Sequence, residues 1–326
     1  PDTGHPTPLV PDWHLLKPRS GVRIVAEPVI LDRNKGEWTI RVREVGERAG
    51  QLRQPPQPTY GRGKGLSLFT QTVIPADYIK AMAQRGKMGS VLYAVATKVT
   101  SRLRFRPSDP ADLRALEAAK RKLERLRPKW EREGIVPTED RYKGDCDRSY
   151  VYGHTTWASL FSSRQLLTLG VLVEELRKLR PEILEVEGQE MGSTVVHLLA
   201  FAIDKIANFN CMSSRWTTRG TIAGKFDRHD FAFKATYAEM ACCVSGGGLE
   251  WVVRNVTKAA RQLGELVDKS PVSLRSRGAV LCSQGSATSL IGLDDQSMTA
   301  IVMDPPYADN VQYSELANFF YVWLKR

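Results

Sequence analysis

Apolar and polar positions alternate over short stretches in the first hundred residues. Gly21 to Ile30 and Trp38 to Val42 have this alternation and are bounded by turn residues, which predicts strands. Gln51 to Lys64 is rich in Pro and Gly and predicts a loop. A short helix is predicted over Pro75 to Ala83 and a strand over Gly89 to Thr97. Residues 1–100 are therefore expected to form a small β-rich unit.

Helical spacing of apolar residues dominates the next part, residues 101–270. Ser108 to Asp112 offers a capping residue and a proline for a helix start, and an apolar face with a Lys- and Arg-rich opposite face follows. Charge runs of this kind usually face water, so we interpret this one as a solvated face rather than a phosphate-binding one. Further long helices are predicted over Arg164–Leu179, Val195–Phe209 and Trp251–Val267.

Residues 271–326 differ in kind from the helical part. Gly278–Cys282 and Ser297–Met303 are short apolar runs that predict buried strands, and the second leads directly into Asp304. Buried strands with turns at their carboxyl ends are typical of a parallel α/β sheet, which binds ligands at that edge. The chemistry is therefore expected at residue 304.

Composition and charge narrow the class of protein. The 326 residues are 42% hydrophobic, enough for sizeable cores, and the net charge of +11 favours a polyanionic partner. No apolar run approaches the roughly 20 residues that cross a bilayer, and the first residues lack a signal pattern, so we expect a cytoplasmic protein without a membrane partner. The five cysteines form no CxxC pair, which argues against a disulfide framework and a zinc site; they are Cys146, Cys211, Cys242, Cys243 and Cys282.

The tetrapeptide from Asp304 to Tyr307 has the chemistry of methyl transfer to an amine. An exocyclic base amine is a poor nucleophile, and a site that methylates it must hold the base out of the stack and accept the amine hydrogens. The Asp304 carboxylate and the Pro305 carbonyl supply acceptors, and Pro305 and Pro306 fix the backbone. Tyr307 offers a ring face to the flipped base. The alternative is a rigid turn that arose by chance, but the preceding β-branched run favours catalysis.

Met303 to Leu316, followed by Phe319 to Lys325, resembles a bacterial and archaeal family of adenine-specific DNA methylases that contain a zinc-ribbon insert. Thr7–Trp13, Thr155–Trp157 with Arg164–Leu167, and Gly285–Thr288 resemble the same family, so the resemblance covers nearly the whole chain. It implies S-adenosylmethionine-dependent methylation of adenine in double-stranded DNA, in a restriction or phage-defence context.

Two features depart from the family. Its Gly-rich cofactor loop is missing, since we interpret Gly246–Gly248 as a helix lead-in, so the chain is expected to be partial and to need a methyl-donor half from elsewhere. Of the cofactor contacts, the resemblance leaves Ser286 and Asp304. Where the family has CxxCG, this chain has Ser67 to Gln71, and Thr3 replaces another cysteine. Hydroxyls bind Zn²⁺ poorly, so we expect a ribbon without metal.

The expected fold class is α/β, with part of a Rossmann-like methyltransferase sheet (residues 271–326) after a degenerate ribbon (1–100) and a mostly helical insert (101–270) for target recognition. Asn310 and Tyr313 are candidates for lining the base pocket. The basic and aromatic stretch 213–233 is a candidate for DNA contact, although its side chains also suit packing. Its candidate residues are Arg215, Trp216, Arg219, Lys225 and Arg228.

Two other functions remain open. The chain can be a non-catalytic, nucleic-acid-binding subunit or fragment that needs a partner, such as another defence-system subunit, for the cofactor site. It can also be an RNA or protein methylase that uses the same tetrapeptide.

Overall fold

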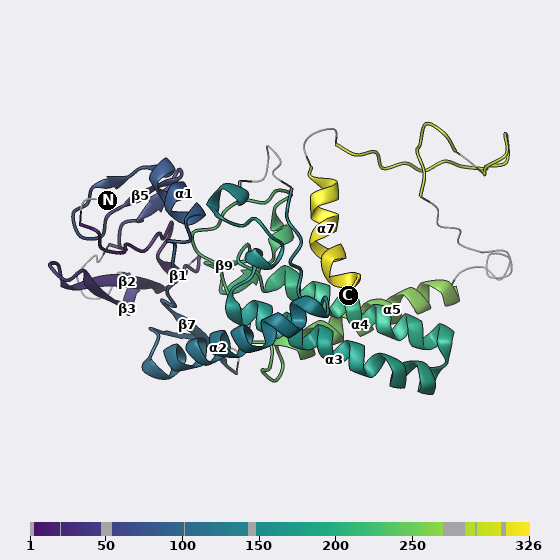
Figure 1. Ribbon diagram of the computed structural model, residues 1–326, viewed down its shortest axis with the longest axis horizontal. Coiled ribbons are helices and arrows are strands. Elements are labelled where there is room, and N and C mark those ends of the chain that lie inside the picture. The colour runs from purple at the N-terminus through teal and green to yellow at the C-terminus, as the bar shows by residue number, and fades with distance from the viewer. Residues whose placement is uncertain are drawn as a thin grey trace.

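The computed structural model describes residues 3–19, 21–46, 54–100, 102–142, 148–269, 284–290, 292–307 and 311–326. It combines long helices with small antiparallel sheets, the β-rich part at one end and the helices at the other (Figure 1). No helix within these ranges has the length and apolar character needed to cross a membrane.

The β-rich end contains two three-stranded antiparallel sheets and a helix. The first sheet has the order β1-β2-β3, and its strands are β1 (His14–Leu16), β2 (Arg23–Asp32) and β3 (Glu37–Val45). The second sheet contains β4 (Tyr60–Gly61), β5 (Lys64–Leu66) and β6 (Val73–Ile74), and α1 (Ala76–Gln84) follows it. Trp13, Leu15 and Ala26 are buried in a cluster on the first sheet, against which Tyr93 and Phe105 pack. The strands predicted near residues 21–30 and 38–42 and the helix near 75–83 are confirmed.

Two β-hairpins join the β-rich end to the helices. One consists of β7 (Val95–Val99) and β8 (Arg102–Arg106), so the strand predicted from Gly89 begins six residues later. The other consists of β9 (Arg215–Thr217) and β10 (Thr221–Ala223). Their aromatic side chains meet edge to face, because the ring centroids of Phe105 and Trp216 are 5.8 Å apart.

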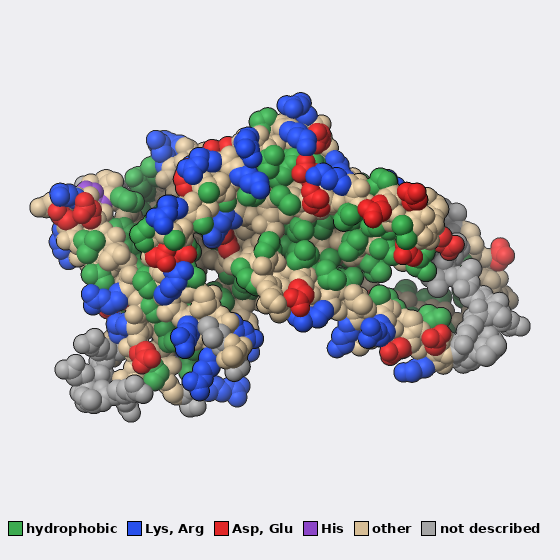
Figure 2. All heavy atoms as spheres, turned by 90° about the horizontal axis from the view of Figure 1, so that it is seen from below, with side chains coloured by type: hydrophobic (Ala, Val, Ile, Leu, Met, Phe, Trp, Pro, Cys, Tyr) green, Lys and Arg blue, Asp and Glu red, His purple; other side chains and the backbone are tan. Residues whose placement is uncertain are grey.

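The helical part contains α2 (Pro110–Arg132), α3 (Ser163–Glu187), α4 (Gln189–Phe209) and α5 (Gly248–Lys269). The start predicted at Ser108–Asp112 is confirmed, because Asp109 accepts hydrogen bonds from the backbone of Ala111 and Asp112. The helices predicted from Arg164, Val195 and Trp251 begin one, six and three residues earlier, and Ser162 caps the first of them through a capping box with Gln165. Short 3₁₀ helices lie at Tyr150–Tyr152, Ala158–Leu160 and Lys225–Asp227. Figure 2 shows hydrophobic side chains gathered over this part of the surface.

The C-terminal region ends in α7 (Tyr313–Leu324), which packs on the helical core. Phe319 and Trp323 are 1% and 3% exposed, and both rings contact Phe161. Arg326 extends the attachment by donating to the carbonyl of Gly134 at 2.8 Å.

The strand predicted over Ser297–Met303 is wrong in this structure. The segment is irregular, and Val302 is 97% exposed. A strand is stable only when its backbone groups pair, and among the described residues every strand pairing is antiparallel and lies elsewhere in the chain. The other predicted strand, Gly278–Cys282, lies outside the described residues. A Rossmann-like sheet is therefore not confirmed, and the described chain is a mixed assembly of helices and small antiparallel sheets.

Candidate active site and nucleic-acid contacts

The tetrapeptide Asp304–Tyr307 lies in an irregular segment that runs far out from the body before α7 (Figure 1). All four residues are exposed, and Tyr307 has 66% of its surface accessible. The carboxylate, the Pro305 carbonyl and the tyrosine ring can therefore all meet an incoming ligand. The prolines restrict this segment locally, since each fixes its own φ.

Tyr313 connects the tetrapeptide to the first turn of α7. Its hydroxyl oxygen accepts a hydrogen bond from the backbone N–H of Tyr307 at 3.3 Å, and its side chain is 46% exposed. Because α7 is anchored by Phe319 and Trp323, this bond places Tyr307 close to a fixed element. The other candidate for lining the base pocket, Asn310, lies outside the described residues.

Ser286 lies in an exposed turn of the same irregular segment. Its hydroxyl is 2.8 Å from that of Thr288 and also accepts the Thr288 N–H. Within the described part of the chain, no hydrogen bond joins this turn to Asp304. The two candidate cofactor contacts are thus exposed on one segment and are not assembled into a shared pocket.

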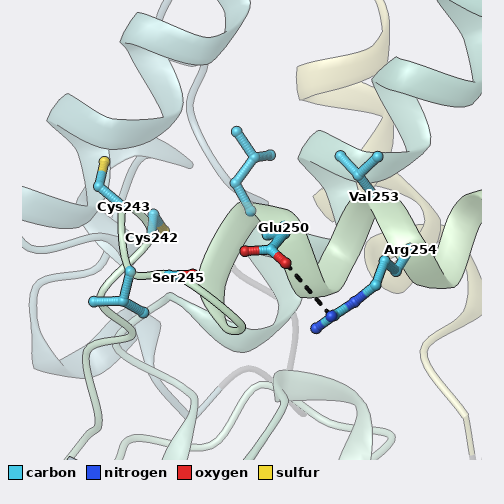
Figure 3. Close-up of a pocket in the computed structure, with 8 residues that line it drawn as sticks. Cys242, Cys243, Ser245, Glu250, Val253 and Arg254 are labelled. Atoms are coloured by element: carbon cyan, nitrogen blue, oxygen red, sulfur yellow. Dashed lines mark ion pairs between the residues drawn. The ribbon is translucent and has the colours of Figure 1, made fainter.

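A groove of about 530 Å³ lies beside the glycines that precede α5 (Figure 3). Helix N-termini attract anions because their N–H groups are unpaired. Here, however, the Glu250 carboxylate accepts the Gly246 N–H at 2.7 Å and pairs with Arg254 at 3.4 Å. The chain's own carboxylate thus occupies one of the loop's donors. Gly246–Gly248 leads into α5 as predicted, although the helix begins at Gly248, three residues before the predicted start at Trp251.

Lys225 is buried, with only 2% of its surface exposed. Its ammonium lies 4.1 Å from the Phe231 ring centroid and donates to the Asp230 carbonyl at 2.9 Å. Burial lowers the pKa of this lysine to about 8. The expectation that Lys225 contacts DNA does not fit this position, because aromatic packing holds the side chain inside the molecule.

The other candidates for DNA contact are in three different environments. Arg215 pairs with Asp227 at 2.7 Å, and Arg228 pairs with Asp230 at 2.8 Å, so both charges are already partnered on the surface. Trp216 donates its indole N–H to the Leu15 carbonyl at 2.7 Å and so joins the hairpin to the first sheet. Arg219 is exposed at the tip of the β9–β10 hairpin and has no ion-pair partner among the described residues.

A buried cation that sequence reasoning did not single out holds this region together. Arg141 is 4% exposed; its guanidinium lies 4.8 Å from the Phe231 ring centroid and 5.3 Å from that of Trp157. It also donates to the carbonyl of His154 at 2.7 Å. The interleaving of basic and aromatic residues in the sequence was the one signal that pointed to this region, and it marks packing at Lys225 and Trp216.

Ser67 to Gln71, where the sequence resemblance expects a degenerate zinc ribbon, form a tight turn. The Gln71 N–H donates to the Ser67 carbonyl at 3.0 Å, and the Thr70 N–H donates to the Ser67 hydroxyl at 3.3 Å. Gln71 has a φ of 61°, a conformation that favours glycine. Thr7 accepts the Leu68 N–H at 3.4 Å, which places the first residues of the chain beside this turn. Within the described ranges, no group of three metal-ligating side chains comes together.

No family model, no curated protein and no solved structure matches this chain.

Proposed function

We propose that this chain provides the base-binding side of a DNA adenine N6-methyltransferase that uses S-adenosylmethionine. The observation that carries the proposal is the exposed tetrapeptide Asp304–Tyr307, whose last residue is hydrogen-bonded to Tyr313 at the start of the anchored helix α7. The Asp304 carboxylate and the Pro305 carbonyl accept hydrogen bonds from the two N–H groups of the adenine amine as its nitrogen becomes tetrahedral, and one of these protons leaves after methyl transfer. The Tyr307 ring stacks on the flipped base.

The apolar residues just before the tetrapeptide are exposed, which supports the proposal that another part of the enzyme packs against them. Ile301, Val302 and Met303 present apolar side chains to solvent at 68%, 97% and 76% of their surface. In a Rossmann-like sheet these residues would form the strand that ends at Asp304. We propose that this strand forms when the methyl-donor half of the enzyme is supplied. Ser286 and Asp304 then contact the cofactor, which provides the electrophilic methyl group.

The main alternative is a nucleic-acid-binding subunit that catalyses nothing. It is favoured by the groove beside Gly246–Gly248, whose loop donates to Glu250 instead of offering its N–H groups to a cofactor. Calorimetric titration of S-adenosylmethionine into residues 1–326 tests whether the cofactor site lies in this chain. We expect no binding at micromolar concentrations. Ordinary micromolar affinity would show that the donor site lies in this chain.

Methyl transfer is tested on the natively purified protein with its co-purifying chains. Radiolabelled S-adenosylmethionine is offered with duplex DNA, RNA and protein, and we expect label in DNA adenine. Asp304→Ala should reduce the rate by about 100-fold or more, because it removes an acceptor aligned with developing charge. Asp294→Ala, which changes an exposed carboxylate on the same segment, should leave the rate unchanged.

Three results would contradict the proposal. Label in DNA that survives Asp304→Ala would remove the role assigned to that carboxylate. Label confined to RNA or to protein would identify a different methylase. DNA binding without label on any substrate would favour the non-catalytic subunit.

A further inference from the structure

Three segments far apart in the sequence meet where the β-rich end joins the helices. The apolar side of β8 packs on the β9–β10 hairpin, since Phe105 lies against Trp216 and a Cβ at Gly220 would be 2.3 Å from Leu103. The residue after β1, Lys17, donates its N–H to the Thr218 carbonyl at 2.8 Å. The β9–β10 hairpin thus contacts both the apolar side of β8 and the segment after β1.

The opposite face of β8 carries two exposed arginines. Successive side chains of a strand alternate between its faces, so Arg102 and Arg104 point away from the side that packs through Leu103 and Phe105. Both arginines are exposed. Two residues of strand span about 6.8 Å, which leaves room for each guanidinium to reach a separate acceptor.

Further cations surround this hairpin, and acidic residues are absent from the segments that build it. Residues 14–19, 95–106 and 215–223 contain no Asp or Glu. Arg106 and Arg215 pair with Asp112 and Asp227 from neighbouring segments. The remaining six cations are exposed and have no ion-pair partner among the described residues. We call five of them the basic hairpin surface: Lys17, Arg19, Arg102, Arg104 and Arg219. The sixth, Lys98, is paired with Leu103 and therefore lies on the other face of the hairpin.

We propose that the β7–β8 hairpin enters the major groove of duplex DNA, with Arg102 and Arg104 toward the base edges and the other cations of the basic hairpin surface toward the phosphates. The choice of DNA as partner rests on the proposed function. The B-form major groove admits a two-stranded β-ribbon, and arginine binds guanine edges through two hydrogen bonds. The major groove of A-form RNA is too narrow for side chains to read, so duplex RNA fits less well.

This surface is separate from the tetrapeptide. In Figure 1 the β7–β8 hairpin lies between the β-rich end and α2, whereas the irregular segment before α7 runs outward from the other side of the molecule. DNA binding through the hairpin is therefore expected to survive Asp304→Ala. If methyl transfer fails while hairpin-dependent binding persists, the proposed function falls and the groove contact stands. If methyl transfer occurs without hairpin-dependent binding, the proposed function stands and the groove contact falls.

The test is fluorescence anisotropy of the whole chain on labelled duplex DNA across a salt series. The double variant Arg102→Gln/Arg104→Gln should bind at least about tenfold more weakly than wild type. Each lost phosphate contact at Lys17 or Arg219 should lower the slope of log K against log salt by about 1. The matched control is Arg114→Gln/Arg125→Gln, which removes two exposed charges from α2 and should bind like wild type.

Circular dichroism melting verifies that the exposed substitutions leave the fold intact. Equal losses in the hairpin and control variants would show diffuse charge attraction and overturn the proposal. Wild-type binding by the hairpin variant would overturn it as well. So would a preference for duplex RNA or for anionic phosphatidylserine vesicles over duplex DNA.

Discussion

Asp204 and Lys225 are ionisable residues packed into the helical part, where their charges lose contact with water. Asp204, on α4, is 7% exposed, and its Oδ1 has no hydrogen-bond partner within the described structure. Desolvation raises the pKa of this carboxyl from 3.8 to about 8. Lys225 shows the opposite shift for the same reason. Asp204 therefore lowers the free energy of unfolding progressively as pH rises from about 4 to about 8, and Lys225 does so as pH falls from about 10.5 to about 8.

The variant Asp204→Asn tests this effect. Between pH 4 and pH 8 the folded protein holds a proton on Asp204 that the unfolded chain has released, so stability falls as pH rises through this range. At pH 9 the variant should be more stable than wild type by a few kcal/mol, on the order expected for a shift of this size. At pH 4 the two should agree. Urea unfolding at both pH values measures the difference.

The control for this measurement is Asp268→Asn, which changes an exposed carboxylate near the end of α5. Its unfolding free energy should differ little from that of wild type at either pH. A variant at position 204 that is no more stable at pH 9 than at pH 4, relative to wild type, would show that Asp204 is solvated.

At the scale of elements, α2 and α3 approach closely because a glycine faces a tryptophan. A Cβ at Gly170 would lie 2.3 Å from the ring of Trp130, which is fully buried. Gly170→Ala should therefore destabilise the protein by about 1–2 kcal/mol, since overpacking outweighs the gain in helix propensity. Gly264→Ala on α5 meets open space and should stabilise by up to about 1 kcal/mol. Thermal unfolding of the two variants gives opposite shifts; a stabilising Gly170→Ala would exclude the close approach.

The turn from Ser67 to Gln71 contains a residue with a strained backbone. Gln71 has a left-handed φ of 61°, so Gln71→Gly should stabilise the protein by about 0.5–1 kcal/mol despite the entropy that glycine loses on folding. Gly4 has a φ of 73°, and a Cβ there would meet no neighbouring atom within 4 Å, so backbone strain alone should make Gly4→Ala destabilising by about 1 kcal/mol. The urea midpoints of unfolding of the two variants measure these effects. Shifts in the same direction for both variants would contradict the role of the left-handed backbone.

At the scale of the whole molecule, an exposed segment lies between α5 and α7, which both pack on the helical core. Every described residue from 284 to 307 is exposed, whereas Phe319 and Trp323 on α7 are buried. Limited chymotrypsin digestion should cut near Leu293, Met298 or Met303. The C-terminal piece should remain bound, because α7 buries aromatic rings and Arg326 bonds to Gly134.

Gel filtration of the nicked protein, followed by mass spectrometry, measures this association. Trp323→Ala should release the C-terminal piece after the same cut, since it removes a large buried ring. Separation of the wild-type pieces would show that α7 is held only by its connection, and resistance of the segment to cleavage would contradict its exposure.

Local patterns in the sequence determined the helices and much of the β-rich end. Apolar spacing located α3, α4 and α5, and the Asp109 and Ser162 caps follow from side chains that satisfy nearby backbone N–H groups. These patterns depend only on residues a few positions apart, so they predict helices without knowledge of the rest of the fold. The tetrapeptide and its acceptor chemistry are also properties of adjacent residues.

Only the tertiary structure decided which charged and apolar residues are covered. Lys225 and Arg219 lie six residues apart in one basic stretch, yet aromatic rings enclose the first while the second stays exposed. Ser297–Met303 has the composition of a strand but remains irregular, because a strand needs a neighbouring strand to pair with. The basic hairpin surface likewise arises only when three distant segments pack together, since burial and charge clustering depend on contacts that local sequence does not encode.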